Sequence, residues 1–225
     1  MKLLIIEDEK VLSESISAFF EKEGFVCETA MTFDAAEEKI HLYHYDCLIV
    51  DLTLPDGNGL DIIKALKKIS SQTGIIIVSA RSALDDKIIG LEIGADDYLT
   101  KPFHLAELNA RVKSVIRRKS FEGKNEIVIN EIKILPDSAE VFVNNQLIVL
   151  TRKEYELLLF FIANKNRVLN RESIAEHLWG DDMDASDSFN FIYTHIKNLR
   201  KKIMEKTDTD YILNVYGMGY KFSTL

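Results

Sequence analysis

Short, wholly apolar runs recur through the first half of this 225-residue chain and strongly limit its fold. Leu3–Ile6, Cys47–Val50 and Ile75–Val78 each hold four apolar residues in succession. A strand with one face in water alternates apolar and polar positions, so unbroken runs indicate strands that are buried on both faces. Segments with apolar residues at helical spacing, such as Lys10–Glu23 and Leu105–Arg118, separate these runs. The alternation predicts an α/β doubly wound domain with a five-stranded parallel sheet.

Polar side chains stand where the predicted strands end: Glu7 and Asp8, Asp51, Ser79 and Lys101. The carboxyl ends of parallel strands meet at one edge of the sheet, where ligands bind. Carboxylates gathered in this way need a hard cation, and Mg²⁺ prefers such oxygen ligands. An ammonium group and a hydroxyl group suit the oxygens of a phosphoryl group, which an aspartate can accept as an acyl phosphate. We therefore predict a Mg²⁺-dependent phosphoaspartate site at Asp51.

Two other interpretations of these residues are open. Taken alone, Glu7 is more typical of a solvated strand end, and Asp8 and Asp51 are equally typical of one, but five suitable residue types at four strand ends favour a site. An aspartate-nucleophile phosphatase uses the same kind of sheet and needs a second aspartate close after the nucleophile. Thr53 stands two residues after Asp51 and cannot act as a general acid, and no substrate-cap insertion is visible. We expect a protein that accepts a phosphoryl group and is not an enzyme.

Composition limits the partners of the chain. The net charge is −8, with 15 basic and 20 acidic residues in 1–119 and 13 basic and 16 acidic residues in 120–225. A domain that binds nucleic acid is usually basic overall, so either half would have to bind through a local stripe. No window is apolar enough for a membrane span or a signal peptide, which predicts a cytoplasmic protein. Cys27 and Cys47 fall in predicted strands and are expected to be buried, reduced thiols.

The second half of the chain has a different pattern. Residues 119–125 are polar, contain Gly123 and are expected to form a linker between domains at 1–118 and 126–225. Four short strand-like runs then precede three predicted helices, at 152–164, 171–178 and 188–206, and a hairpin around Gly217-Met218-Gly219. This order predicts an α+β winged helix-turn-helix domain.

The third of these helices is amphipathic in a way that indicates DNA binding. Its apolar stripe contains Ile192, Ile196, Leu199 and Ile203. The remaining surface carries amide, hydroxyl and basic side chains, which hydrogen-bond to base edges and phosphates. We expect this helix to enter the major groove of double-stranded DNA. The alternative is an ordinary solvated helix face. The candidate contact residues are Asn190, Thr194, Lys197, Asn198, Arg200, Lys201 and Lys202.

The first half resembles the receiver domain of two-component response regulators. The matching residues are Glu7-Asp8, the segment Val50-Asp51-Leu52-Thr53-Leu54-Pro55-Asp56-Gly57-Asn58-Gly59, Ser79, and Tyr98 before Thr100-Lys101-Pro102-Phe103. The resemblance implies that Asp51 accepts a phosphoryl group from a sensor histidine kinase. It implies a Mg²⁺ site made by Glu7, Asp8, Asp51 and the backbone carbonyl of Thr53. Lys101, before a cis bond to Pro102, would bind a phosphoryl oxygen.

The resemblance also implies how the signal spreads. Ser79 and Tyr98 would form a switch pair in which the hydroxyl group moves to the phosphoryl group and the aromatic ring turns inward. A symmetric dimer would form on phosphorylation through self-complementary surfaces. Asn109 stands where the apolar patch of that surface often has alanine. The alternative is a solvated helix face. The candidate dimer residues are Lys87, Ile88, Leu91, Asp96, Asp97, Glu107 and Arg111.

The second half resembles the output domain of OmpR/PhoB-type regulators, through Leu150-Thr151, Trp179-Gly180, the segment 195–203 and the segment 215–222. The resemblance implies a transcriptional regulator that binds tandem DNA half-sites, and an acidic loop, Asp181–Asp184, where RNA polymerase is contacted. Tyr216 departs from the arginine that the family often has in the wing. The remaining alternative is a regulator whose DNA binding ignores phosphorylation.

Overall fold

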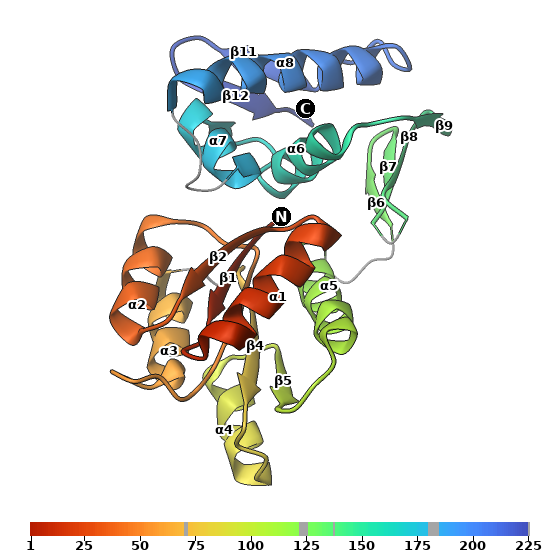
Figure 1. Ribbon diagram of the computed structural model, residues 1–225. Helices are drawn as coiled ribbons and strands as arrows, with labels where there is room; N and C mark the ends of the chain where they lie inside the picture. Colours follow the sequence, from red (N-terminus) through yellow and green to blue (C-terminus); the bar gives the residue numbers. More distant parts are fainter. Residues whose placement is uncertain (70–71, 122–125, 137, 180–184, 225) are drawn as a thin grey trace. The chain divides into compact units, whose positions relative to one another are not determined.

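The computed structural model describes residues 1–225 apart from 70–71, 122–125, 137, 180–184 and 225, and leaves out the side chains of 120–121 and 185–190. The chain divides into two compact units, Met1–Gly123 and Lys124–Leu225 (Figure 1). Within the described ranges, none of the helices is long and apolar enough to cross a membrane.

The first unit is a parallel five-stranded sheet with helices between consecutive strands, as predicted. The strand order is β2-β1-β3-β4-β5, and every neighbouring pair is parallel. The elements are β1 (Lys2–Ile6), α1 (Lys10–Glu23), β2 (Val26–Ala30), α2 (Phe33–Leu42), β3 (Cys47–Val50), α3 (Gly59–Ile69), β4 (Gly74–Ser79), α4 (Leu84–Ile93), β5 (Asp97–Thr100) and α5 (Leu105–Phe121).

Two apolar layers cover the two faces of this sheet. Alternate strand residues such as Leu3 and Ile49 pack with α1 and α5, whereas Leu4 and Val50 pack with α2 and α3. Figure 1 shows these helices on the two sides of the strands. Burial on both faces explains why the strands are continuous apolar runs. It also leaves the strand ends as the places where polar side chains can gather.

Helix α5 continues to Phe121, beyond the predicted end of the helix at Arg118 and into the predicted linker. Lys119 forms an ion pair with Asp96, with 2.9 Å between Nζ and Oδ1. Basic residues also suit the negative end of a helix dipole. These two effects extend the helix through a stretch whose composition alone indicated a linker.

A buried ionic cluster closes the amino-terminal end of the sheet. Glu28 on β2 lies 2.7 Å from Nζ of Lys2 and 2.8 Å from Nζ of Lys39, and it accepts a hydrogen bond of 2.6 Å from the Tyr45 hydroxyl. The Lys2 ammonium group also lies 4.5 Å from the centre of the Tyr43 ring. These three donors more than offset the effect of burial and lower the pKa of the Glu28 carboxyl group.

The second unit begins with an antiparallel sheet and ends with a hairpin beside three helices. Its elements are β6 (Ile127–Ile129), β7 (Ile132–Leu135), β8 (Glu140–Val143), β9 (Gln146–Ile148), α6 (Arg152–Ala163), β10 (Val168–Leu169), α7 (Arg171–Trp179), α8 (Ala185–Met204), β11 (Ile212–Val215) and β12 (Gly219–Phe222). The sheet orders are β6-β7-β8-β9 and β10-β12-β11.

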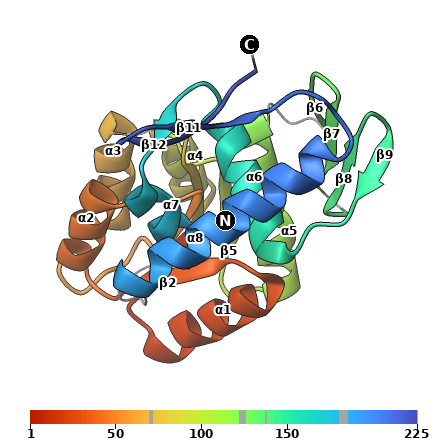
Figure 2. The ribbon, with the colours of Figure 1, turned by 90° about the horizontal axis from the view of Figure 1, so that it is seen from above.

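Several local signals in this unit have the structure that the sequence predicts. Asn144 and Asn145 both have positive φ, as a two-residue hairpin turn requires. Thr151 and Glu154 form a capping box at the start of α6. Helix α8 packs against α6 and α7 in both views (Figures 1 and 2). Strand β10 was not predicted, because two residues give no periodicity; its pairing with β12 fixes the hairpin to the domain.

Candidate functional site

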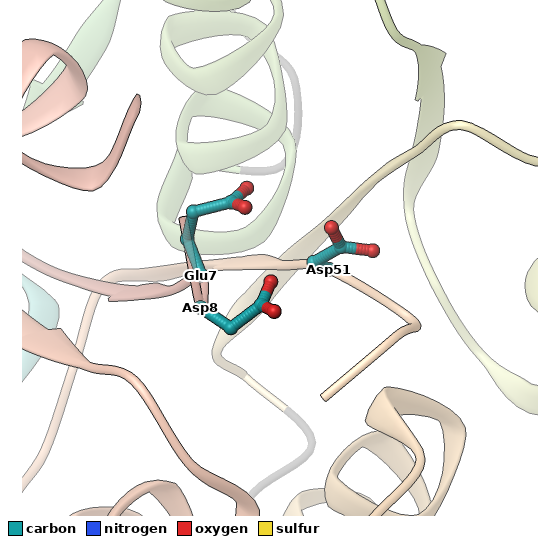
Figure 3. A group of neighbouring side chains, drawn as sticks. All are labelled: Glu7, Asp8 and Asp51. Carbon is teal, nitrogen blue, oxygen red and sulfur yellow. The ribbon is translucent and has the colours of Figure 1, made fainter. Parts of the chain in front are cut away.

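Three carboxylates meet at the carboxyl edge of the parallel sheet. Glu7 and Asp8 follow β1, and Asp51 follows β3, the neighbouring strand. Oxygen atoms of the three side chains all lie within 4.8 Å of one another. Figure 3 shows the side chains pointing into a shared space. Glu7 and Asp51 are buried and Asp8 is exposed, so the cluster is open to solvent on one side.

Lys101 partly neutralises this cluster. Its Nζ lies 2.7 Å from Oδ2 of Asp51 and 2.7 Å from Oε2 of Glu7. Burial alone lowers the pKa of Lys101, but hydrogen bonds to Asp51 and Glu7 outweigh burial and raise it. The ammonium group therefore stays charged beside the carboxylate. The peptide bond before Pro102 is cis, as the family resemblance implied.

The residues fit a divalent cation. Burial raises the pKa of Glu7, Lys101 opposes that shift, and the charge on Asp51 adds to it. Lys101 pairs with two of the three carboxylates, so the cluster keeps excess negative charge that a hard cation can neutralise. The receiver-type acidic pocket of Glu7, Asp8 and Asp51 is thus typical of a Mg²⁺ site.

The residues after Asp51, up to the start of α3, pack closely against Asp51. The amide of Thr53 donates a 3.0 Å hydrogen bond to Oδ1 of Asp51, which orients the carboxylate. A Cβ atom on Gly59, the first residue of α3, would lie 2.1 Å from the carbonyl oxygen of Asp51. Only glycine allows α3 to begin so close to the end of β3.

Ser79 and Tyr98 lie on neighbouring strands beside the cluster. Ser79 is fully buried, and its Oγ accepts a 3.3 Å hydrogen bond from the amide of Arg81. The Tyr98 hydroxyl donates a 2.8 Å hydrogen bond to the carbonyl of Arg81. Burial raises the pKa of Tyr98, and its hydrogen bond with Ser79 acts in the opposite direction. The loop at Arg81 therefore joins the two predicted switch residues.

Four charged residues of the predicted dimer face, Asp96, Asp97, Glu107 and Arg111, form ion pairs within one chain. Arg111 on α5 lies 2.9 Å from a carboxylate oxygen of Asp97 and 2.8 Å from one of Glu107. These hydrogen bonds raise the pKa of Arg111. Asp96 pairs with Lys119. A dimer interface that used these charges would have to exchange or extend the pairs.

Helix α4 adds apolar surface to the same face. Ile88 and Leu91 are both exposed, and Lys87 is partly exposed. Asn109 does not join them, because its Nδ2 donates a 2.9 Å hydrogen bond to Glu23 on α1. The amide therefore points toward α1.

On α8 the predicted apolar stripe is buried, and the predicted contact residues line the rest of the helix. Thr194, Lys197, Asn198 and Lys201 are exposed. Three of the predicted contact residues make ion pairs within the domain: Arg200 with Asp210, Lys202 with Glu154 at 2.6 Å, and Lys201 with Glu205 at 3.9 Å. Asn190 belongs to α8, but its side chain lies outside the described residues, as does the acidic loop Asp181–Asp184.

A groove of about 540 Å³ separates α8 from the β11–β12 hairpin. Lys197 and Lys201 line it from the helix, and Asn214 and Tyr220 line it from the hairpin. Tyr193, also on the helix side, was not among the predicted contact residues. The sequence places Tyr193 beside the polar face of the helix. An aromatic side chain at such a position can be either buried or exposed, so the sequence alone did not indicate a contact residue.

Both halves of the chain match known families. The model of the response regulator receiver domain matches residues 3–113, and the model of the C-terminal domain of transcriptional regulatory proteins matches residues 145–222. A receiver domain joined to a DNA-binding domain defines the class: a two-component response regulator with a DNA-binding output domain.

Relatives match along nearly the whole chain. The transcriptional regulatory protein PmrA of Pectobacterium parmentieri is 37% identical over 222 residues, covering 98% of this chain and 96% of its own. The alkaline phosphatase synthesis transcriptional regulatory protein PhoP of Bacillus subtilis is 36% identical over 231 residues, covering 98% and 95%. The chain belongs to the OmpR/PhoB family of two-component response regulators. It is a regulator and not a phosphatase.

Solved structures agree with this assignment for the first unit. The receiver domain of the Francisella response regulator 1452 aligns with a TM-score of 0.50 at 36% identity, covering 52% of this chain and 97% of that one. A two-component response regulator from Clostridium difficile gives a TM-score of 0.50 at 30% identity, covering 52% and 97%.

Proposed function

We propose that Asp51 is the phosphoacceptor of this regulator and that its charge state controls DNA binding. The observation that carries the proposal is the pairing of Asp51 with Lys101 inside the three-carboxylate cluster. One Asp51 oxygen would form a bond to phosphorus as the bond from phosphorus to the kinase's histidine nitrogen breaks. Lys101 would then bind a phosphoryl oxygen in place of the carboxylate oxygen.

Glu7, Asp8 and Asp51, with the backbone carbonyl of Thr53, are proposed to hold Mg²⁺. When bound, the ion neutralises the carboxylates and the incoming phosphoryl oxygens. Glu7 and Asp8 keep the negative charge that retains the ion, and the Thr53 amide holds Asp51 in one orientation. Lys101 supplies a second positive charge, which balances the phosphoryl group.

Ser79 and Tyr98 are proposed to change position when Asp51 is phosphorylated. A phosphoryl group adds about −1.5 to −2 charges and three acceptor oxygens. The Ser79 hydroxyl can donate to one of them, and the movement of its oxygen toward the phosphoryl group would break the bond that it accepts from the Arg81 amide and shift the loop that holds Tyr98. Tyr98 lies on β5, next to α4 and α5. The movement would therefore reach the proposed dimer face directly.

The second unit is proposed to place α8 in the major groove, with two copies of the protein on tandem half-sites. Thr194, Lys197, Asn198 and Lys201 are the exposed candidates for the first contacts. Arg200 and Lys202, with Asn190, remain proposed contacts at the edges of this face. We further propose RNA polymerase as a partner of the acidic loop and the cytoplasm as the place of action, since the DNA lies there.

Labelling with phosphodonor tests the site assignment. The wild type, incubated with Mg²⁺ and radiolabelled acetyl phosphate, should take up one acid-stable, base-labile phosphoryl group. Asp51→Ala should take up none, and Asp61→Ala, an exposed carboxylate on α3, should behave as the wild type. Equal labelling of Asp51→Ala would refute the assignment. DNA binding with and without the donor separates this function from a regulator that ignores phosphorylation.

A further inference from the structure

The β3–α3 loop, residues 51–58, folds back on itself beside the acidic cluster. Thr53 and Asn58 pair in an antiparallel bridge at its base. Asn58 also caps α3, because its Oδ1 accepts a 3.0 Å hydrogen bond from the Leu60 amide. The loop is therefore a small hairpin whose base contains Thr53 and whose exposed tip contains Asp56.

Asp56 joins the tip of this loop to α2, a helix that comes earlier in the chain. Its Oδ1 accepts a 2.6 Å hydrogen bond from the Phe33 amide, and its Oδ2 accepts a 3.1 Å hydrogen bond from the Asp34 amide. The bond from Phe33 is the largest cause of a lowered pKa for the Asp56 carboxyl group, which therefore stays charged at neutral pH. Hydrogen bonds from backbone amides to a carboxylate are stronger than those between neutral groups.

Two side chains share the capping of α2. The first amide groups of a helix have no acceptor within the helix. Asp56 accepts hydrogen bonds from the first two, those of Phe33 and Asp34. Thr32, the residue before the helix, accepts one from the third, that of Ala35, at 3.3 Å. Of these two caps, the one made by Asp56 also connects the helix to the β3–α3 loop.

Close packing supports the same connection. A Cβ atom on Gly57 would lie 2.7 Å from Cγ of the Phe33 ring, so the backbone of the loop tip rests on that ring. Leu54, before the tip, is buried in the apolar layer that also contains Ala36 and Ile40 of α2. Because buried side chains hold α2 on the sheet, the loop tip is attached to a rigid element.

The position of Thr53 depends on this attachment. Its amide orients Asp51 through the 3.0 Å hydrogen bond to Oδ1, and its backbone carbonyl is a proposed Mg²⁺ ligand. Thr53 is itself exposed, so the core does not hold its side chain. Mg²⁺ demands a near-ideal octahedral arrangement of ligands, and a ligand that moves lowers the affinity. Groups that orient metal ligands typically contribute roughly 10- to 100-fold to metal affinity.

We infer that Asp56 is a positioning residue for the Mg²⁺ site: it fixes the β3–α3 loop on α2 and thereby holds Thr53 where its carbonyl can bind the ion. This inference rests on the proposed Mg²⁺ site and deepens it. Both oxygen atoms of Asp56 are bound to amides of α2, so Asp56 acts through the loop and not as a ligand. Its removal should therefore change the affinity for Mg²⁺ more than the rate of phosphorylation at saturating Mg²⁺.

The test is a calorimetric titration of the metal-free, full-length protein with Mg²⁺. Asp56→Ala should bind Mg²⁺ about tenfold more weakly than the wild type. Asp56→Asn keeps one acceptor oxygen for the amides of α2 and should lose only about threefold. At saturating Mg²⁺, acetyl phosphate should phosphorylate Asp56→Ala within about twofold of the wild-type rate, because the reacting groups are unchanged.

Two control variants separate positioning from stability and from charge. Thr32→Ala removes the other cap of the same helix and should lower the melting temperature as Asp56→Ala does, but it should leave Mg²⁺ affinity unchanged. Asp34→Asn removes an exposed negative charge at the same helix end and keeps the backbone amide. It should bind Mg²⁺ as the wild type does.

Hydrogen exchange gives a second readout that needs no ion. The Gly59 amide donates a 3.0 Å hydrogen bond to the Leu52 carbonyl, and the Thr53 amide is bound to Asp51. In metal-free Asp56→Ala both amides should exchange about tenfold faster than in the wild type, because the loop opens more often. In Thr32→Ala both should exchange at the wild-type rate.

Three results would overturn the inference. The first is Asp56→Ala binding Mg²⁺ within about twofold of the wild type. The second is Thr32→Ala weakening Mg²⁺ binding as much as Asp56→Ala. The third is unchanged exchange of the Thr53 and Gly59 amides in Asp56→Ala. Asp51→Ala tests the metal site separately: if it binds Mg²⁺ with wild-type affinity, the proposed site itself is wrong, whatever Asp56 does.

Discussion

The ammonium group of Lys101 lies 2.7 Å from Oδ2 of Asp51, so the proposed phosphoacceptor is already paired with a cation in the unmodified protein. Lys101 also contacts Glu7, a proposed metal ligand. The lysine therefore has two effects of opposite sign. It supplies charge to an incoming phosphoryl group, and it competes with Mg²⁺ for the same carboxylates.

Replacing Lys101 with alanine should separate these two effects. The variant should bind Mg²⁺ about 3- to 10-fold more tightly, since a competing charge worth about 1 kcal/mol is gone. It should take up phosphoryl groups more slowly and respond less to them. Calorimetric titration with Mg²⁺ measures the first effect. Lys119→Ala is the matched control, because that lysine is also paired with a carboxylate and is 21% exposed, against 19% for Lys101. Weaker Mg²⁺ binding by Lys101→Ala would contradict this account.

Gly59→Ala should disrupt the site through the backbone. The added methyl group would meet the Asp51 carbonyl at 2.1 Å, and that atom cannot rotate away. We expect a loss of about 3 kcal/mol or more in the free energy of unfolding, with weakened phosphorylation. Gly217→Ala is the control: its surroundings are open, and its φ of +73° should cost only about 1 kcal/mol. Urea denaturation of both variants gives the comparison. Similar losses would show that contact at Gly59 is relieved by movement of α3.

The sequence was sufficient for the parallel sheet and for most of the acidic site. Asp51 directly follows a buried strand, and in a parallel sheet this places it at the same edge as Glu7 and Asp8. The pairing of β1 with β3, which brings the three carboxylates together, comes from the structure. The end of α5 was less accurate, because Lys119 is held by Asp96, a residue distant in sequence. Helix propensity does not account for contacts between residues that are far apart in the sequence.

The ion pairs within each unit could not be predicted from the sequence either. Spacing brings Lys202 onto the polar part of α8, but only the packing of α6 against α8 brings Glu154 within 2.6 Å of it. The same holds for Arg111, whose partner Asp97 comes from another element. A helical pattern does not show which charged residues form ion pairs within the domain. Lys201 pairs with Glu205 only at 3.9 Å and its side chain is 75% exposed, so the structure ranks Lys197 and Lys201 before Lys202 as proposed contacts.

Glu28→Gln should destabilise the receiver unit in a pH-dependent way. Lys2, Lys39 and Tyr45 hold the pKa of Glu28 below its ordinary value of 4.5. A lowered carboxyl pKa adds stability above the unfolded pKa, and this stability is lost as the pH falls through the folded pKa. At pH 7 the variant should lose about 3 kcal/mol, because the ammonium group of Lys2 stays buried without its carboxylate.

The difference between Glu28→Gln and the wild type should shrink as the pH falls through the lowered pKa of Glu28, because the wild-type carboxyl group then becomes protonated itself. Chemical denaturation at several pH values measures it. Glu38→Gln, at an exposed position on α2, is the control and should change stability by less than about 0.5 kcal/mol at each pH. A constant deficit for Glu28→Gln across the whole range would mean that packing, and not charge, is responsible.

Lys197→Ala and Lys201→Ala should each weaken DNA binding and flatten its salt dependence. Each exposed ammonium group is proposed to neutralise one phosphate, and releasing a counterion contributes a slope of about one unit. Lys133→Ala, on the β6–β9 sheet and paired with Glu126, should leave the slope unchanged. Fluorescence anisotropy at several salt concentrations gives both quantities. If Lys133→Ala flattened the slope as much as Lys197→Ala, the phosphates would be bound by the antiparallel sheet, and α8 would lose its proposed place in the major groove.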